Sequence, residues 1–178
     1  PAVRTPHTDR LVKQGVSIIN AYIMGGSSPA VCSPSRYSVL TGRYNWRSTL
    51  QKGIVGVYGD PLISEDRLTV PGFLKRHGYH TAAIGKWHLT PADQISPAGP
   101  YDRWPLGRGF DRYYGFLGGD THQYYPDLTY DNHRVEPPAT PDEGYHLTED
   151  LVDTTIRFIA DSKQIAPNKP FFAYFATG

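Results

Sequence analysis

The chain has 178 residues, of which 39% are hydrophobic and 20% charged, and its single cysteine is Cys32. This length and composition are those of one globular domain with a buried core, and a lone cysteine excludes an internal disulfide framework and any multi-cysteine metal site. The formal net charge of +1 gives no field that would attract nucleic acid or an anionic membrane. The sequence contains no apolar run of about 18 residues, so no membrane span is predicted.

Helices and strands are expected to alternate through the first half of the chain. In chain order, the patterns predict a helix at 8–14, a strand at 16–23, a loop at 25–29, a helix at 34–42, mostly loop at 43–68, a helix at 69–77 and a strand at 80–85. The helices have plausible N-caps at Thr8, Ser33 and Thr69, and each ends at a glycine.

The second half begins with a Pro/Gly/Tyr-rich excursion at about 90–144, which shows no sustained period and is too long for a plain connection. Thr148 then caps a predicted helix at 149–163, whose apolar face is expected to contain Val152, Ile156, Ile159 and Ala160. A buried strand follows at 169–178. Alternating strands and helices predict an α/β fold with a mostly parallel sheet flanked by helices.

The segment Cys32-Ser33-Pro34-Ser35-Arg36 lies where a loop is expected to enter a helix. Free backbone N–H groups at a helix start favour anions, and the forked guanidinium of Arg36 suits sulfate or phosphate oxygens. From residue types alone, Cys32 is either a small buried hydrophobic residue or a nucleophilic thiolate.

Lys86 and His88 follow the predicted strand at 80–85 and point the same way if the chain stays extended. A cation and an imidazole beside an anion site suit charge stabilisation and proton transfer. The alternative reading is a surface lysine and a histidine that caps a loop.

The string Cys-Ser-Pro-Ser-Arg at 32–36, with Thr-Gly-Arg at 41–43, resembles the signature of type I sulfatases, Cys-x-Pro-x-Arg with a trailing Thr-Gly-Arg. In that family the cysteine is converted to formylglycine, an aldehyde that is hydrated in the active site. The resemblance implies that Cys32 yields the nucleophile, that a formylglycine-generating enzyme is a partner, and that the substrate is a sulfuric ester. It also implies a partial N-terminal catalytic domain of the sulfatase, alkaline-phosphatase-like fold over 1–178.

The string Gly-Lys-Trp-His at 85–88 resembles a second motif of the same family, Gly-Lys-x-His. The resemblance implies that Lys86 binds the sulfate and the hydrate, and that His88 is the base that removes the hydrate proton. Arg36 would hold the hydrated aldehyde, and Arg43 would support the same turn from behind. Further blocks are similar to bacterial arylsulfatases, at 86–93, 104–111, 114–118, 125–128 and 145–150.

Type I sulfatases hold calcium, or magnesium in some members, through two pairs of polar residues and the formylglycine itself. The resemblance therefore implies that Cys32, as formylglycine, is a metal ligand. The other ligands, a second histidine and a further lysine are expected before Pro1 and after Gly178. We expect the chain to be a piece of a larger protein, with little or no activity alone.

Other readings remain open. The parent is alternatively a phosphonate monoester hydrolase or phosphodiesterase of the same superfamily, or a non-catalytic anion-binding descendant in which Cys32 stays a thiol. The polar residues of the excursion fit no known metal-ligand spacing, so a substrate-facing wall or plain loop packing is favoured for His122, Tyr124, Tyr125, Asp127 and Asp131. The lone cysteine is compatible with a bacterial cytoplasm and also with a periplasm.

Overall fold

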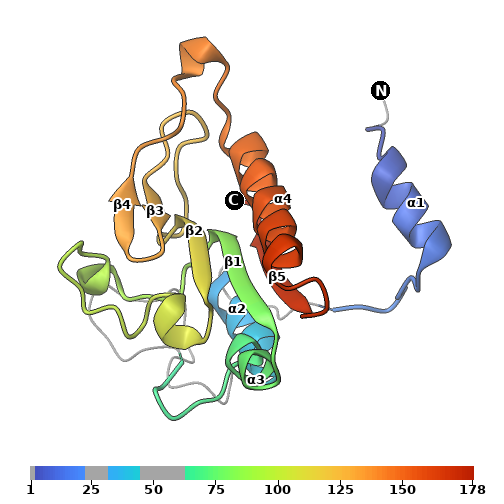
Figure 1. Ribbon diagram of the computed structural model, residues 1–178, viewed down its shortest axis with the longest axis horizontal. Helices are drawn as coiled ribbons and strands as arrows, with labels where there is room; N and C mark the ends of the chain where they lie inside the picture. Colours follow the sequence, from blue (N-terminus) through green and yellow to red (C-terminus); the bar gives the residue numbers. More distant parts are fainter. Residues whose placement is uncertain (1–2, 23–31, 45–62) are drawn as a thin grey trace.

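The computed structural model describes residues 3–22, 32–44 and 63–178. The strands in this part of the chain are β1 (His80–Lys86), β2 (Arg112–Phe116), β3 (Leu128–Tyr130), β4 (His133–Val135) and β5 (Phe171–Ala176). They form one sheet in the order β4-β3-β2-β1-β5 (Figure 1). β1 pairs in parallel with both β2 and β5, whereas the β2–β3 and β3–β4 pairs are antiparallel. The α/β prediction is confirmed, with a mixed sheet whose parallel part is β2-β1-β5.

The helices of the described residues are α1 (Pro6–Gln14), α2 (Cys32–Thr41), α3 (Val70–Arg76) and α4 (Leu147–Ile165). The start of α3 matches the sequence prediction, because the Thr69 side chain accepts a hydrogen bond from the Gly72 amide. The cap of α4 differs from the prediction: His146 is the N-cap, and its side chain accepts from the amide of Thr148.

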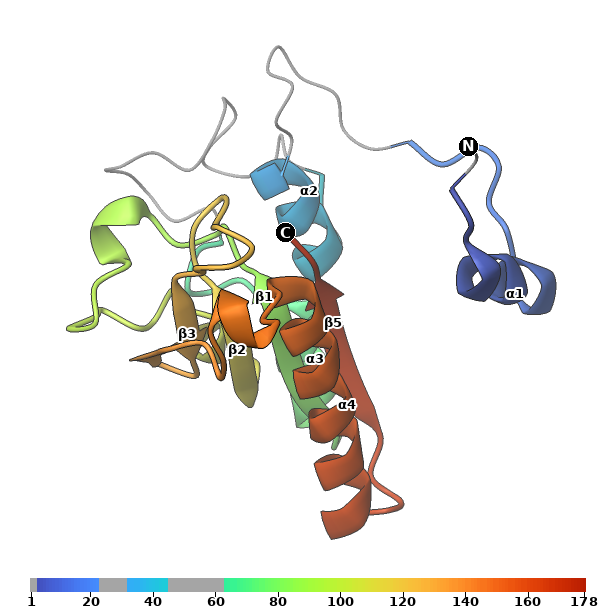
Figure 2. The same ribbon diagram turned by 90° about the horizontal axis from the view of Figure 1, so that it is seen from above.

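The two faces of the sheet carry separate hydrophobic clusters because side chains alternate along each strand. On β1, Ala82 and Ile84 belong to the cluster that also contains Leu151 of α4. Ala83, between them, belongs to the cluster that contains Tyr37 of α2. Accordingly, α4 covers one face of the sheet and α2 lies on the other (Figure 2). This layering places the start of α2 beside the carboxyl edge of the parallel strands.

The predicted strand at 16–23 is wrong for residues 16–22, and residue 23 lies outside the described part. Residues 16–22 form no strand, and Val16 and Ile19 are 94% and 90% exposed. β-branched residues favour an extended chain, but a strand also needs a partner for its backbone hydrogen bonds. α1 begins at Pro6 rather than at Thr8, buries no residue and stands apart from the sheet in both ribbon views (Figures 1 and 2).

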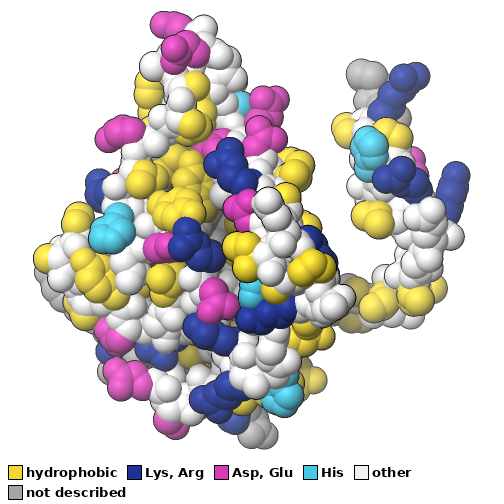
Figure 3. Space-filling model, viewed as in Figure 1, with side chains coloured by type: hydrophobic (Ala, Val, Ile, Leu, Met, Phe, Trp, Pro, Cys, Tyr) yellow, Lys and Arg dark blue, Asp and Glu magenta, His cyan; other side chains and the backbone are white. Residues whose placement is uncertain are grey.

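The apolar face predicted for α4 is also wrong. Leu151 is fully buried against the sheet, whereas Ile156 is 59% exposed. The helix carries two apolar stripes roughly 145° apart at 3.6 residues per turn, and the stripe of Leu147, Leu151 and Phe158 is the one that packs on the sheet. Hydrophobic side chains consequently remain visible on this side of the molecule (Figure 3).

The segment at 90–144 is not an excursion from the sheet. It contains β2, β3 and β4, together with short 3-10 turns, and so supplies three of the five strands. Each of these strands spans only three to five residues, too few to show a period in the sequence. None of the described helices is long and apolar enough to cross a membrane.

Candidate active site

Cys32 lies within the first turn of α2 and is partly buried. The Lys86 ammonium, at the end of β1, donates a hydrogen bond to the Cys32 sulfur over 3.3 Å. The structure therefore brings together two side chains that are 54 residues apart in the sequence. The expected helix start at Pro34 is moved by two residues, so Cys32 belongs to the helix instead of preceding it.

Ser33 is buried and does not serve as the expected N-cap of α2. Its hydroxyl donates a hydrogen bond to the backbone carbonyl of His88 over 3.0 Å. This contact joins the first turn of α2 to the chain that leaves β1. The helix start is thus positioned against the strand by side-chain to backbone hydrogen bonding.

Arg36 lies one helical turn after Cys32, on the same side of α2. Its Nη1 donates to the carbonyl oxygen of Lys86 over 2.6 Å and to the Tyr174 hydroxyl over 3.1 Å. Tyr174 belongs to β5. The guanidinium is therefore attached to both strands that flank the start of α2, and its charge remains beside Cys32 and Lys86.

The backbone after β1 continues to pair with the chain after β2. The amides of Trp87 and His88 donate to the carbonyls of Phe116 and Leu117 over 3.0 and 3.1 Å. His88 has a φ of 54°, which is uncommon for a residue other than glycine and is found at functional sites. The strand pairing and the Ser33 contact together hold the His88 backbone in this conformation.

The His88 ring is enclosed, with its Nδ1 buried and without a hydrogen-bond partner among the described residues. A Cβ atom on Gly119 would lie 2.9 Å from both Cε1 and Nε2 of the ring, so any larger residue there would require the His88 ring to shift. Burial, and then the charges of Lys86 and Arg36, lower the pKa of His88 to about 4, although Asp120 acts in the opposite direction. The imidazole is therefore neutral at pH 7 and able to accept a proton.

The structure brings together four of the residues expected from the sequence, namely Cys32, Arg36, Lys86 and His88. Arg43 is not among them. It lies just beyond α2 and is exposed, and none of its contacts with the described residues supports the turn.

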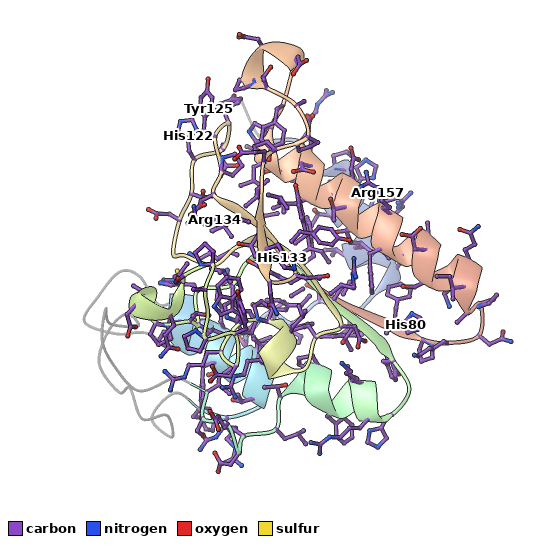
Figure 4. The ribbon with its side chains drawn as sticks, turned by 60° about the vertical axis from the view of Figure 1, so that its left-hand side comes forward. His80, His122, Tyr125, His133, Arg134 and Arg157 are labelled. Atoms are coloured by element: carbon purple, nitrogen blue, oxygen red, sulfur yellow. The ribbon has the colours of Figure 1, made fainter. Side chains whose placement is uncertain are left out.

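The polar residues of the 117–131 segment form local contacts. The Nδ1 atom of His122 accepts from the amides of Tyr124 and Tyr125, and His122 and Tyr125 lie together on one loop (Figure 4). Asp127 pairs with Arg134 over 2.9 Å. In the part of the chain that the structure describes, no group of three or more His, Cys, Asp or Glu side chains is placed to hold a metal ion.

Asp131 supports the sheet. Its Oδ1 accepts from the Tyr113 amide over 2.9 Å, and its Oδ2 pairs with Arg112 over 3.1 Å.

A cavity of about 430 Å³ lies beside α4, on the face of the sheet that α4 covers, and Figure 4 labels two of its lining residues, His80 and Arg157. It shares no residue with the Cys32 cluster and reaches the opposite end of β1.

Sequence reasoning did not find the roles of Ser33, Gly119 and Tyr174. Ser33 lies between Cys32 and Pro34 of the recognised motif, and this position could have indicated a role at the site. Tyr174 lies in an apolar run of β5 and gave no sign that its hydroxyl reaches α2. Its contribution depends on β5 being the neighbour of β1, which the sequence did not specify.

Comparisons with known proteins identify the family of the chain. A family model described as Sulfatase matches residues 1–178. The chain belongs to the sulfatase family. Arylsulfatase J of Mus musculus is 32% identical over 184 residues, which cover 98% of this chain and 28% of that protein. The N-acetylglucosamine-6-O-sulfatase of Bacteroides thetaiotaomicron is 31% identical over 173 residues, which cover 95% of this chain and 25% of that protein.

A solved structure supports the same family and fold. The structure of BT4656 in complex with its substrate D-glucosamine-2-N,6-O-disulfate is 26% identical, with a TM-score of 0.65, and the match covers 97% of this chain and 29% of that one. The sulfatase chain therefore has the alkaline-phosphatase-like sheet expected of its family. It spans less than a third of the length of these relatives.

Proposed function

We propose that the protein containing this sulfatase chain hydrolyses sulfuric esters, with formylglycine made from Cys32 as its nucleophile. The observation that carries the proposal is the 3.3 Å contact between the Lys86 ammonium and the Cys32 sulfur, with Arg36 bound to the same strand end. The sulfur marks the position that the formylglycine oxygens take after conversion. Two cations at a helix start suit an anionic sulfuryl group.

The chemistry explains why a modified residue is required. When hydrated, the aldehyde supplies one hydroxyl that attacks sulfur and expels the alcohol, and a second hydroxyl whose deprotonation releases sulfate, whereas a serine would remain as a stable sulfate ester. Lys86 donates to the oxygens at position 32 and to the sulfuryl group. Arg36 holds its charge at the same place, where negative charge increases during attack on sulfur.

His88 is proposed as the base that removes the second hydroxyl proton. Its imidazole is neutral at pH 7 because burial and two nearby cations lower its pKa. A bound sulfate group brings negative charge, which opposes the effect of Lys86 and Arg36 and makes the imidazole a stronger base during the reaction. The ring lies close to Gly119, where an added Cβ would come within 2.9 Å of its Nε2.

Calcium, or magnesium, is proposed for the complete protein on the family resemblance alone. Cations surround Cys32, and the described residues contain no group of three His, Cys, Asp or Glu side chains that fits a metal ion. The residues described here do not by themselves fit a hard cation, which requires several oxygen ligands. We therefore assign no step of the reaction to the metal.

The named relatives favour a sulfuric ester over the phosphonate or phosphodiester alternative, because they are described as sulfatases. One is named for a sulfated amino sugar and another as an arylsulfatase. The substrate panel should therefore contain an aryl sulfate, 6-O-sulfated amino sugars, a phosphonate monoester and a phosphodiester. Preference for either phosphorus ester over all sulfates would contradict the proposal.

The deciding experiment measures the mass of the tryptic peptide from Gln14 to Arg36, prepared from the native host. The proposal predicts an aldehyde or its hydrate at Cys32, made by a formylglycine-generating enzyme. Cys32→Ala is the matched control and should be both unmodified and inactive. An unmodified thiol in a preparation that hydrolyses sulfate esters would refute the proposed nucleophile, and an unmodified, inactive protein would favour the non-catalytic reading.

A further inference from the structure

We infer that Tyr174 is a positioning residue, whose hydroxyl sets the orientation of the Arg36 guanidinium toward the anion. The inference rests on the proposed function, because it assumes that the Arg36 charge acts on the anion that forms at position 32. It goes beyond that function by giving β5 a part in the reaction, through a side chain that does not itself carry charge.

The Arg36 guanidinium donates to two acceptors, which together fix its orientation. Nη1 donates both to the Lys86 carbonyl, over 2.6 Å, and to the Tyr174 hydroxyl, over 3.1 Å. A single acceptor on one nitrogen leaves the guanidinium free to turn about that hydrogen bond, whereas two acceptors fix its plane. Neither Nε nor Nη2 donates to any residue in the described ranges. Those donors are the ones left for an anion.

Tyr174 is itself held firmly. Its backbone is opposite Ala83 in the β1–β5 ladder, and its ring packs against Phe110 with centroids 6.2 Å apart. Burial raises the pKa of Tyr174, although Arg36 opposes this effect, so the side chain is a neutral phenol at pH 7. The hydroxyl therefore keeps a fixed place, set by the sheet, and remains an acceptor for the guanidinium.

Of the two acceptors, only the Tyr174 hydroxyl belongs to a side chain. The Lys86 carbonyl stays in place whatever the side chain at 86 is. Replacing Tyr174 by phenylalanine preserves the ring and its packing on Phe110 and deletes the second acceptor alone. The long Arg36 side chain then regains rotational freedom that it must lose again on binding the anion.

The test uses the full-length protein from its native host, with Tyr174→Phe and the control Tyr145→Phe. Tyr145 likewise has a hydrogen-bonded hydroxyl, which donates to Asp150 over 3.1 Å, and no hydrogen bond joins it to Arg36 among the described residues. Loss of one hydrogen bond to a charged group corresponds to about a ten- to hundredfold fall in kcat/KM for a sulfate ester. We expect that fall for Tyr174→Phe and less than about a threefold change for the control.

A double-mutant cycle separates positioning from general stability. In an Arg36→Lys background, which lacks the forked guanidinium, Tyr174→Phe should change kcat/KM and the affinity for inorganic sulfate by less than about twofold. An effect of Tyr174→Phe that is the same in both backgrounds would overturn the inference. So would losses in Tyr174→Phe that match those of Tyr145→Phe.

Failure of the proposed function is distinguishable from failure of this inference. If the wild-type protein hydrolyses no sulfate ester, the proposed function fails, and titration calorimetry with inorganic sulfate decides the role of Tyr174. Sulfate binding about tenfold weaker in Tyr174→Phe than in the wild type would still support positioning of Arg36. Equal binding by the two proteins, or no binding by the wild type, would overturn it.

Discussion

Gly85→Ala is the substitution that most directly tests how the end of β1 is placed. Gly85 precedes Lys86, has a φ of 101°, and pairs with Gly115 of β2 and Ala176 of β5. A Cβ atom at this position would lie 2.0 Å from the carbonyl oxygen of Ala176. Because that oxygen belongs to the backbone of a paired strand, no side-chain rotation relieves the contact, and the strands must separate.

The expected cost has two parts. A non-glycine residue with left-handed φ costs about 1–2 kcal/mol, and overpacking against a fixed neighbour adds about 1–3 kcal/mol, so the total is roughly 2–5 kcal/mol. Gly78→Ala is a matched control, because Gly78 has a φ of 85° and nothing within 4 Å of the added Cβ. It should lose only the first part, about 1–2 kcal/mol.

The assay is denaturant unfolding of the full-length protein, comparing the midpoints of both variants with that of the wild type. The midpoint should fall clearly further for Gly85→Ala than for Gly78→Ala, and sulfatase activity should fall with it, because Lys86 is displaced. If Gly85→Ala does not fold, its soluble yield relative to Gly78→Ala gives the same comparison. Equal midpoints, or equal yields, would refute the close packing of β1 on β5 at this position.

Three further substitutions test the contacts of Asp111 and the buried face of α4. Burial raises the pKa of Asp111, but the Lys75 ammonium and the Thr81 amide and hydroxyl outweigh it and the pKa is lowered. The ionised Asp111 carboxylate therefore contributes its full stabilisation of the folded protein above the unfolded pKa of 3.8. This contribution is lost as the pH falls through the lower pKa of the folded state. In urea unfolding, Asp111→Asn should lower the free energy of unfolding by about 1 kcal/mol at pH 7 and by less at pH 3. Equal losses at both pH values would contradict a lowered pKa of Asp111 in the folded protein. Leu151→Ala should cost about 2–5 kcal/mol and Ile156→Ala less than about 0.5 kcal/mol, and the reverse order would contradict the observed face of α4.

The elements that sequence reasoning predicted correctly are those with strong local signals. The helix that Thr69 caps and the strand that follows it were placed to within a residue or two, because a capping residue, a glycine stop and a short apolar run mark them. The Cys32 helix was placed by its expected N-cap Ser33 and the glycine at its end, although its predicted start was two residues too late. Local signals do not depend on knowing which strands are neighbours.

The elements that sequence reasoning missed depend on distant partners. β3 and β4 have three residues each and exist through antiparallel pairing with one another and with β2. The reverse error occurred at 16–22, where the residues favour a strand but none of the described strands pairs with them. α4 shows a related limit: with two apolar stripes, only the position of the sheet decides which stripe is buried.

The candidate site shows the same division. Its members Cys32, Arg36, Lys86 and His88 could be proposed from motifs, because each is defined by close spacing in the sequence. Tyr174 could not, since its contact with Arg36 spans 138 residues and requires β5 to lie next to β1. The residues proposed to perform the chemistry were thus more predictable than the residue proposed to orient them.

The way α2 is attached affects how variants of this site should be interpreted. Ser33 and Arg36 both donate to backbone carbonyls, those of His88 and Lys86 respectively. The helix is therefore held by the main chain of the two residues whose side chains are proposed to act on the substrate. Replacing the side chain of Lys86 or His88 leaves both carbonyl acceptors in place, so α2 and Cys32 keep their attachment to β1. Loss of activity in such variants then reflects lost chemistry and not a displaced helix, whereas substitutions at Ser33 remove one of the two attachments of α2 and leave the side chains of Lys86 and His88 intact.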